Sequence, residues 1–525
     1  MRTRMSIIAD DSMKGREAGG IGNFMMTNYL AHEVARFGLE PGGDNGTWFQ
    51  VIPMVRRYAD SASTLSAGGR SFALFSDFVP VRPTPTLRTG TKLSGTAIPV
   101  TYGGRAGDSS TTLPPADVAG HIIVFDAPLG ANGRPTGTYS TPLAISAARF
   151  PSAAAVAVAA LDLVTPATAT SLRSRGVGLS ATDTVAVRRP MGIVVTSATA
   201  EAIMGAPLAS LKPGAHGIGA SASISFVERP VDAPARNVIA ILRGSDRTLR
   251  NEYVAIGAHS DHLGMLAHPV DHDSLKAFNR VMRPQGGQTP ASQPSAEQWA
   301  AIHSVLDSLR KIRPARLDSV YNGADDDGSG SVALLEIAEA FASGKRPRRS
   351  VIMVWHTGEE AGLLGSAWFT AHTTVPHDSI IAQLNMDMVG RGAAADLPTG
   401  GPRNLQVIGS RRLSTDLGNI VDSVNGRRSV PYQIDYSFDA PGNVMNRYCR
   451  SDHYMYARSG IPIAFISRGY HQDYHQVTDE AEYINYEGLA NVAGFVHDVA
   501  TAIANRGDRV RIDKAKPDPF APCRQ

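Results

Sequence analysis

The sequence has only two cysteines, Cys449 and Cys523, in 525 residues. This scarcity excludes a disulfide scaffold and a zinc site built from thiolates. The two cysteines either form one disulfide or remain unpaired, and the sequence leaves both options open. No run of 18 or more apolar residues occurs, which excludes a membrane-spanning helix. No Gly-x-Ser-x-Gly motif occurs either, which disfavours a serine hydrolase.

The chain also has little net charge, +3 with 19% charged residues, which gives no reason to expect a nucleic-acid or membrane-surface partner. Its 43% hydrophobic content is typical of a folded globular protein. The first residues carry two arginines but no long apolar segment, so they do not form a signal peptide. The length predicts two or three domains.

Composition divides the chain into four parts. Residues 1–83 begin with an amphipathic helix and form the N-terminal part of the main domain. Residues 84–228 are rich in short β-like runs and poor in charge, which predicts a small, mostly-β inserted domain, with its alanine-rich stretch 153–160 as a helix. Residues 229–505 form the catalytic domain, and residues 506–525 a C-terminal tail.

The part after residue 235 alternates between strands and helices, which predicts an α/β sheet with helices on both faces. The expected strands are residues 237–242, 253–258, 351–355, 380–388 and 461–466. Ligands of open α/β sheets bind beyond the carboxyl ends of the strands, where the candidate site residues fall. Residues 264–318 interrupt this pattern. We expect them to form a surface excursion near the mouth of the site, either a lid or a passive insertion.

Several titratable residues follow these strands. His259 and Asp261 lie two residues apart at a strand end, where Asp261 is suited to orient the His259 ring; an ordinary surface triplet is the alternative. Asp326 lies in a run of three aspartates before a helix. Such a run indicates either a cation site or a solvated helix cap, and the spacing does not match an EF-hand.

Paired carboxylates, Glu359 and Glu360, end another strand, so that one can bind a metal while its neighbour faces water. Acidic residues at a helix start are the alternative. Asp387 is a lone carboxylate among apolar residues, suited to metal ligation or a local hydrogen bond. His475 is one of two nearby histidines that the chemistry alone does not separate. Tyr474 is well placed to donate a hydrogen bond to an oxyanion.

In combination, the order His, Asp, Glu-Glu, Asp, His resembles the co-catalytic di-zinc aminopeptidases, the twenty-eighth metallopeptidase family. The matching segments are GAHSDH, NGADDDGSGS, HTGEEAGLLGS, NMDMVG, SDHYMYARSGIP and YHQVTDE, with GREAGGIGN near the start. The resemblance implies a three-layer α/β/α zinc peptidase with a mixed central sheet. The inserted region is similar to a protease-associated domain.

The resemblance also implies two zinc ions per chain, with Asp326 as the shared ligand. His259 and Asp387 would complete one zinc site, and Glu360 and His475 the other. Glu359 would act as the general base, Asp261 would support His259, Tyr474 would polarise the scissile carbonyl, and Asp452 would give structural support.

These roles predict an exopeptidase, and first an aminopeptidase, that acts on peptides through zinc-activated water. A carboxypeptidase of the glutamate-releasing kind shares the ligands but needs an arginine cluster, for which Arg447, Arg450 and Arg468 are the candidates. A one-zinc glutaminyl cyclase is disfavoured because His259 and Asp387 are both present. A metal-free binding module, as in the receptor branch, is disfavoured by the complete ligand set. Members of the family are exported, so the resemblance implies a periplasmic or secreted protein, and the oligomeric state stays open.

Overall fold

The computed structural model describes residues 1–84, 89–108, 110–130, 133–173, 176–180, 189–283, 286–287, 292–443, 445–518, 523 and 525. The chain divides into two compact units, one formed mainly by residues 1–52 and 232–519 and the other mainly by residues 53–231. Both cysteines are disulfide-bonded, which settles the question that the sequence left open. Within the described ranges, no helix is both long enough and apolar enough to span a membrane.

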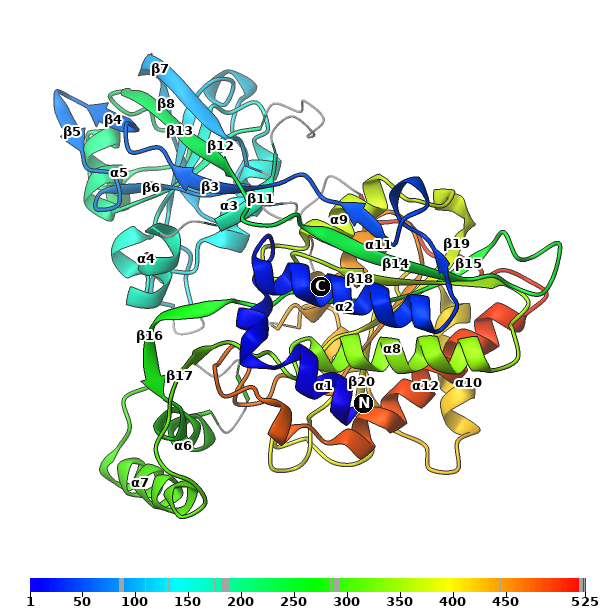
Figure 1. The fold of residues 1–525 in the computed structure, drawn as a ribbon. Coiled ribbons are helices and arrows are strands. Elements are labelled where there is room, and N and C mark those ends of the chain that lie inside the picture. The colour runs from blue at the N-terminus through cyan, green and yellow to red at the C-terminus, as the bar shows by residue number, and fades with distance from the viewer. Residues whose placement is uncertain are drawn as a thin grey trace. The chain divides into compact units, whose positions relative to one another are not determined.

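A mixed central sheet forms the larger unit (Figure 1). In spatial order its strands are β1 (Glu40–Pro41), β14 (Arg236–Leu242), β18 (Ser350–His356), β15 (Tyr253–His259), β19 (Ile380–Met386), β22 (Ile463–Ser467), β20 (Asn404–Ile408) and β21 (Gln433–Asp435), with β2 (Phe49–Val51) also paired to β14. The strands β18, β15, β19 and β22 run parallel, whereas β14 is antiparallel to its neighbours and β20 is antiparallel to β22 but parallel to β21. The predicted mixed α/β sheet is therefore confirmed.

Helices cover both faces of this sheet. On one face lie α1 (Arg2–Ile8), α2 (Ile21–Arg36), α8 (Gly328–Ser343), α10 (Thr415–Gly426) and α12 (Tyr486–Asn505), and on the other α9 (Leu364–Ala371) and α11 (His453–Arg458) (Figure 1). Two adjacent residues of β18 show that successive side chains point to opposite faces of the sheet. The Trp355 indole donates to the carbonyl of Ser331 in α8, whereas the His356 ring contacts Phe369 of α9 and Tyr456 of α11. Both faces are buried, as three layers require.

The smaller unit contains two sheets. One has the strand order β6 (Phe78–Pro80), β12 (Met191–Val195), β10 (Ala155–Ala159), β9 (Ile122–Asp126) and β8 (Val100–Arg105). The other has the order β11 (Gly176–Leu179), β3 (Met54–Ala59), β13 (Ala220–Pro230), β4 (Thr64–Ala67) and β5 (Arg70–Phe72), with β7 (Lys92–Ile98) also paired to β13. The helices α3 (Ser140–Arg149), α4 (Pro166–Arg173) and α5 (Ser197–Met204) accompany them.

Two expectations for this region were wrong. The alanine-rich stretch forms the buried strand β10, not a helix, because it lies between two parallel neighbours where small and β-branched side chains pack well. The boundary of the unit lies at Pro53, not at residue 84. Strands β3, β4 and β6 belong to it because they pair with β11, β12 or β13, and β5 belongs to it because it pairs with β4. The likeness to a protease-associated domain stays a prediction.

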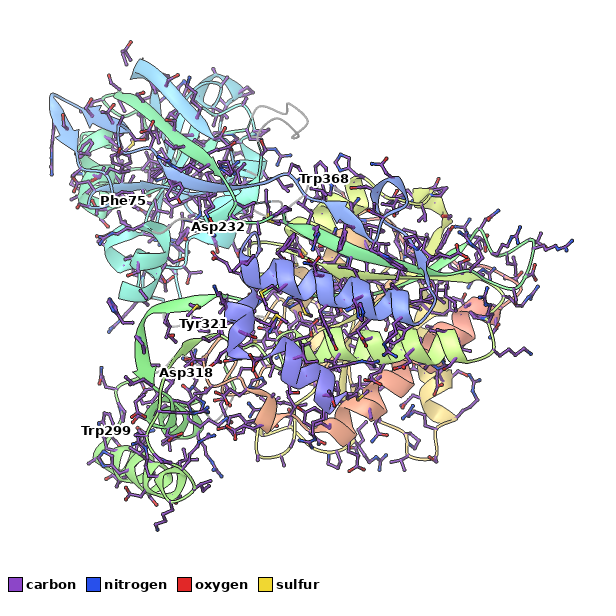
Figure 2. The ribbon with its side chains drawn as sticks, viewed as in Figure 1. Phe75, Asp232, Trp299, Asp318, Tyr321 and Trp368 are labelled. Atoms are coloured by element: carbon purple, nitrogen blue, oxygen red, sulfur yellow. The ribbon has the colours of Figure 1, made fainter. Side chains whose placement is uncertain are left out.

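Residues 264–318 form a separate excursion from the larger unit. It consists of the antiparallel ribbon β16 (Met265–Asp271) and β17 (Leu317–Val320), with α6 (His272–Met282) and α7 (Ala296–Arg310) between them (Figures 1 and 2). Both helices have capped N-termini. The Asp271 side chain accepts from Ser274 N, and Ser295 forms a capping box with Gln298. Residues 265–320, with both strands included, are called the α6–α7 insertion below.

Candidate metal centre

Three parallel strands of the central sheet end at the same edge and bring side chains from distant segments together. His259 is the last residue of β15, Asp387 directly follows β19, and Glu359 and Glu360 follow β18. Their strands are neighbours in the order β18, β15, β19. In this arrangement the candidate ligands lie beyond the carboxyl ends of the strands, where the sequence predicts them.

The loop before α8 carries Asp326 into the same place, and its neighbours hold it there. The Asp327 carboxylate caps α8 by accepting from Gly330 N at 2.9 Å, and it also accepts from His259 N at 3.0 Å. The Asp479 carboxylate accepts from the backbone N–H groups of Asp325 and Asp326, at 3.0 and 3.1 Å. A cis peptide bond joins Asp326 to Asp327.

A buried arginine from the N-terminal segment GREAGG ties these loops to each other. The guanidinium of Arg16, only 1% exposed, donates to the carbonyls of Ser260 at 3.2 Å and Gly323 at 2.9 Å. Ser260 adjoins His259, and Gly323 lies in the loop that carries Asp326. The segment GREAGG, part of the GREAGGIGN motif that resembles the family, thus fixes the spacing between the His259 segment and the Asp326 loop.

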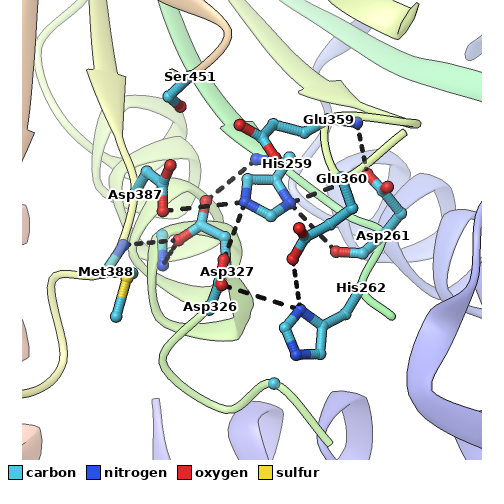
Figure 3. Close-up of polar contacts among 12 residues, drawn as sticks. His259, Asp261, His262, Asp326, Asp327, Glu359, Glu360, Asp387, Met388 and Ser451 are labelled. Atoms are coloured by element: carbon cyan, nitrogen blue, oxygen red, sulfur yellow. Dashed lines mark hydrogen bonds and ion pairs between the residues drawn. The ribbon is translucent and has the colours of Figure 1, made fainter. Parts of the chain in front are cut away.

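The five predicted ligands form two groups that share Asp326, and Figure 3 shows four of them, His259, Asp326, Glu360 and Asp387. Potential metal-binding side chains also gather as His259, Asp326 and Asp387 in one group and as His262, Asp326 and Glu360 in the other. In the first half-site, His259 Nε2 lies 3.2 Å from Asp326 Oδ1 and 3.8 Å from Asp387 Oδ1. In the second half-site, His475 Nε2 lies 3.1 Å from Asp326 Oδ2 and 3.1 Å from Glu360 Oε2. The two carboxylate oxygens of Asp326 therefore face different partners, as a bridging ligand requires.

These separations and donor types suit zinc. Tetrahedral ligands that each lie about 2.0–2.1 Å from zinc are roughly 3.4 Å from one another. His259 Nε2 and Asp326 Oδ2 are buried and have no hydrogen-bond partner among the described residues, although each faces an oppositely charged group. Imidazole and carboxylate are the donors of hydrolytic zinc sites. The residues present therefore fit two metal ions.

Charge in the centre favours cations at both half-sites. Burial lowers the pKa of His475, but the carboxylates of Glu360 and Asp326 outweigh this and raise the pKa to about 10. Burial likewise opposes a charged His259, yet Asp326 and Asp387 hold its pKa well above the ordinary value. Positive charge is stabilised at both positions, and a metal ion would supply it with neutral imidazole ligands.

The Glu359 carboxylate lies beside the ligands without belonging to either half-site. Burial raises the pKa of Glu359 well above its ordinary value, and the nearby carboxylates of Glu360, Asp387 and Asp452 raise it further, while His259 opposes them. Its backbone N–H donates to Asp261 Oδ1 at 3.1 Å. A carboxylate with a raised pKa is suited to accept a proton and release it again.

Asp261 supports His259 differently from the expectation. Its backbone carbonyl oxygen, not its carboxylate, lies 3.1 Å from His259 Nδ1, and the nearest carboxylate oxygen is 3.8 Å away. The carboxylate instead accepts from Glu359 N. The reason is that the chain leaves the β15 strand conformation at Ser260, so the simple alternation of side chains no longer applies. Asp261 therefore links the first half-site to the candidate base.

The ambiguity between the two C-terminal histidines is resolved by their surroundings. His471 is fully buried, and its Nε2 lies 3.2 Å from Asp325 Oδ2, away from the shared Asp326. His475 faces both Asp326 and Glu360. The Tyr474 ring stacks on His475 with centroids 3.8 Å apart, and its hydroxyl accepts from Arg450 Nη2 at 3.2 Å. Tyr474 thus lies beside the second half-site.

One residue that the sequence reasoning missed lies against the second half-site. His262 Nδ1 is 2.7 Å from Glu360 Oε1 (Figure 3). The other carboxylate oxygen, Glu360 Oε2, faces His475. This hydrogen bond orients the Glu360 carboxylate and leaves its other oxygen for a metal. The signal was a third titratable residue in the segment GAHSDH, directly after Asp261.

An α/β domain whose sheet edge holds histidines and carboxylates around one shared aspartate is the arrangement of a metal-dependent hydrolase. The model for "Peptidase family M28" matches residues 237–500. This range covers half of the chain and includes all five predicted ligands. The chain belongs to peptidase family M28.

Curated relatives match part of this region. A leucine aminopeptidase 1 of Paracoccidioides brasiliensis (strain Pb18) is 31% identical over 195 residues, which are 34% of this chain and 47% of that protein. A leucine aminopeptidase 1 of Fusarium vanettenii is 26% identical over 275 residues, 45% of this chain and 66% of that protein. The chain spans about half the length of the first of these relatives.

Solved structures also resemble the chain. An aminopeptidase from Aneurinibacillus sp. strain AM-1 is 16% identical, with a TM-score of 0.48, and the match covers 98% of this chain and 95% of that chain.

Proposed function

We propose that this chain is a zinc-dependent aminopeptidase that holds two zinc ions and removes N-terminal residues from peptides. The observation that carries the proposal is the convergence of five ligand side chains into two half-sites that share Asp326. The names of the curated relatives, leucine aminopeptidases, support the choice of reaction and make leucine the first residue to test.

Zinc ions in the two half-sites would supply Lewis-acid chemistry toward a water molecule and the scissile carbonyl. Glu359 accepts the proton of the attacking water and passes it to the leaving amine, for which its raised pKa is suited. Tyr474 donates a hydrogen bond to the oxyanion that develops on the carbonyl. Burial raises the pKa of Tyr474 well above its ordinary value, so the hydroxyl keeps the proton that it must donate.

The positions of three arginines weigh against a carboxypeptidase of the glutamate-releasing kind. Arg468 donates to the backbone carbonyl of Gly401 at 2.6 Å. Arg447 bonds Gln406 and lies between the rings of Phe438 and Tyr470. Arg450 donates to the Tyr474 hydroxyl at 3.2 Å, and Arg447 and Arg450 both lie over the Tyr470 ring. Arg468 and Arg447 thus have partners within the protein, whereas a substrate with two carboxylates needs arginines that are free to face it.

A glutaminyl cyclase, the second alternative, needs only one zinc. Its ligands would be one Asp, one Glu and one His, and such a site would make His259 and Asp387 dispensable. Here both side chains are buried and face Asp326 with donor atoms within 3.8 Å of each other. This complete first half-site supports the peptidase proposal.

Export of the protein is also proposed, on the family resemblance and on the disulfide-bonded cysteines. Disulfides persist in oxidising compartments, such as the bacterial periplasm and the extracellular space, and are rare in the cytosol.

The activity test uses two substrate panels on the purified chain. One panel contains aminoacyl-p-nitroanilides, starting with leucine, and the other contains N-blocked peptides. Release from free-amine substrates only, abolished by a chelator and restored by zinc, is the expected result. Release of C-terminal residues from the blocked peptides would move the assignment to a carboxypeptidase, and silence on both panels would contradict the proposal.

The base is tested by Glu359→Gln, which keeps the shape of the side chain but cannot accept the proton. We expect kcat to fall about 10²–10⁴-fold, the usual contribution of general acid–base catalysis, while the zinc content measured by atomic absorption stays unchanged. Undiminished turnover would remove Glu359 from the mechanism. Asp246→Asn, at an exposed ion pair with Arg348 outside the site, is the control and should keep full activity.

A further inference from the structure

The α6–α7 insertion contacts the segment that carries His475. This segment, residues 470–483, is called the His475 loop. Lys276 in α6 is 8% exposed, and its ammonium donates to Asp473 Oδ2, two residues before His475. The same ammonium lies 3.6 Å from the centroid of the Tyr483 ring. A helix of the insertion thus places a buried positive charge within the His475 loop.

Charge balance around Asp473 depends on this lysine. Asp473 Oδ2 also accepts from Arg391 Nη1 at 2.6 Å, and Arg391 Nε donates to Asp396 Oδ1 at 3.1 Å. The group therefore holds two cations, Lys276 and Arg391, and two carboxylates, Asp473 and Asp396, all largely buried. Removal of Lys276 would leave one buried carboxylate without its matching charge, which destabilises the local arrangement.

The other side of His475 is held by the same helix. Asp473 Oδ1 accepts from the Thr478 hydroxyl at 2.8 Å, which closes the loop around His475. Asn279, one turn after Lys276 in α6, donates to the same hydroxyl oxygen at 3.5 Å. Residues before and after His475 are therefore both linked to α6.

His475 needs such support because its backbone is strained. Its φ angle is +58°, in the left-handed region that residues with a Cβ rarely adopt. A strained backbone of this kind persists only where the surrounding contacts over-determine it. The contacts of Asp473 and Thr478 with α6 meet this need on the two sides of the strained residue.

The insertion holds the His475 loop at two more places. At one end, Gly287 N donates to the carbonyl of Tyr470 at 3.1 Å, and a Cβ on Gly287 would lie only 2.6 Å from Tyr474 Cβ. At the other end, His272 Nε2 lies 3.2 Å from Glu480 Oε1, and Arg316 donates to Glu480 Oε2 at 2.9 Å. Because Arg316 also contacts the His272 ring, these groups are satisfied by one another and need no metal.

We propose that the α6–α7 insertion is a fixed brace for the second half-site, with Lys276 as the positioning residue that holds the His475 loop in its metal-binding conformation. The inference rests on the proposed function only because it assumes two bound metal ions, and it differs from both expectations for this segment, a lid and a passive insertion. Lys276 acts through Asp473 and touches neither metal ligand. The predicted effect is therefore on zinc affinity at one half-site, not on the chemistry itself.

Zinc titration of the full-length, chelator-treated protein, in competition with a fluorescent chelator, tests this proposal without any activity measurement. Lys276→Met should weaken one of the two zinc ions about 10–100-fold and leave the other unchanged, the usual effect of losing a group that orients a ligand. The affected zinc should be the one that His475→Ala removes. Lys276→Arg, which keeps the charge, should restore most of the affinity.

Arg310→Met is the matched control, because Arg310 is a cation of the insertion that forms ion pairs with Asp271 and Asp273, which also lie in the insertion. Its zinc binding should equal that of the wild type. Unchanged zinc affinity in folded Lys276→Met, or equal weakening of both ions, would overturn the proposal. Loss of tertiary structure in both Lys276→Met and the milder His272→Gln would also overturn it, because the insertion would then serve folding in general. Loss of peptidase activity on every panel, with these zinc affinities as predicted, would contradict the proposed function alone.

Discussion

The two half-sites share Asp326 but are built in different ways. In the first, His259 ends a buried strand and Asp387 follows the next one, with side chains 1% and 6% exposed. In the second, Glu360 and His475 lie on loops, with side chains 9% and 33% exposed. The first half-site is therefore formed by the folding of the sheet itself, whereas the second depends on contacts between the His475 loop, His262 and the insertion.

This difference predicts unequal zinc affinities at the two half-sites. The backbone of His475 is in the left-handed region, which costs about 1–2 kcal/mol for a residue with a Cβ. Any part of this cost that the contacts with the α6–α7 insertion do not offset appears as weaker zinc affinity, and about 1.4 kcal/mol corresponds to a tenfold change. We therefore expect the first half-site to bind zinc more tightly than the second.

Removal of the shared ligand Asp326 should abolish zinc binding at both half-sites. Asp326→Ala deletes the carboxylate whose two oxygens face His259 and His475, so both half-sites lose a ligand. We expect the zinc content to fall from two ions per chain to nearly none and turnover to be lost. Metal analysis after gel filtration measures this. Retention of one tightly bound zinc would show that Asp326 belongs to one half-site only.

Tyr474→Phe should separate catalysis from metal binding within the second half-site. The hydroxyl is lost while the ring still stacks on His475. We expect kcat to fall about 10²–10³-fold, as when one donor to an oxyanion is removed, with zinc content unchanged. Steady-state kinetics on leucine p-nitroanilide provide the readout. A rise in KM with unchanged kcat would instead assign Tyr474 to substrate binding.

His262→Gln should weaken the second half-site alone. The Glu360 carboxylate loses the hydrogen bond that orients it, which should reduce zinc affinity there about 10–100-fold. Competition with a chelator measures the two affinities separately. His32→Gln, at a histidine whose side chain is 76% exposed, serves as the control. A loss at the first half-site would contradict the assignment of His262.

The smallest effect is expected from Glu480→Gln, in the His475 loop, where Glu480 forms ion pairs with His272 and Arg316. Burial opposes the charge of Glu480, but His272 and Arg316 lower its pKa to about 2. A carboxyl group with a lowered folded-state pKa stabilises the protein above its ordinary pKa of about 4.3, and this contribution disappears as the pH falls toward 2.

The variant should therefore melt about 1–2 °C below the wild type at pH 7, and the gap should narrow below about pH 4 and close toward pH 2. Differential scanning calorimetry at several pH values measures it. A gap that stays constant with pH would mean that the ion pair contributes nothing that depends on the charge of Glu480.

Much of the first half-site could be predicted from the sequence, because His259 and Asp387 each come at the end of an apolar strand and parallel strands end at one edge. Asp261 shows the limit of this reasoning, because the chain leaves the strand conformation one residue earlier and exchanges the roles of carbonyl and carboxylate. The second half-site was harder to predict from the sequence. Its supports, His262 and Lys276, contact residues about 100 and 200 positions away, and no local pattern encodes such pairs.

The smaller unit was harder to predict for a related reason. The stretch 153–160 has the alanine content of a helix, yet its two parallel neighbours make it a buried strand. The boundary at Pro53 also depends on strand pairs whose members lie more than 100 residues apart. Local composition does not reveal pairings over such distances.

The central claim, two unequal half-sites around one aspartate, is tested most directly by zinc titration of the wild type beside His259→Ala and His475→Ala. We predict two zinc ions per chain in the wild type, with affinities that differ at least about tenfold. His475→Ala should lose the weaker ion and keep the tighter one, whereas His259→Ala should lose the tighter one. A single zinc in the wild type, two equal affinities, or loss of the tighter ion in His475→Ala would contradict this account.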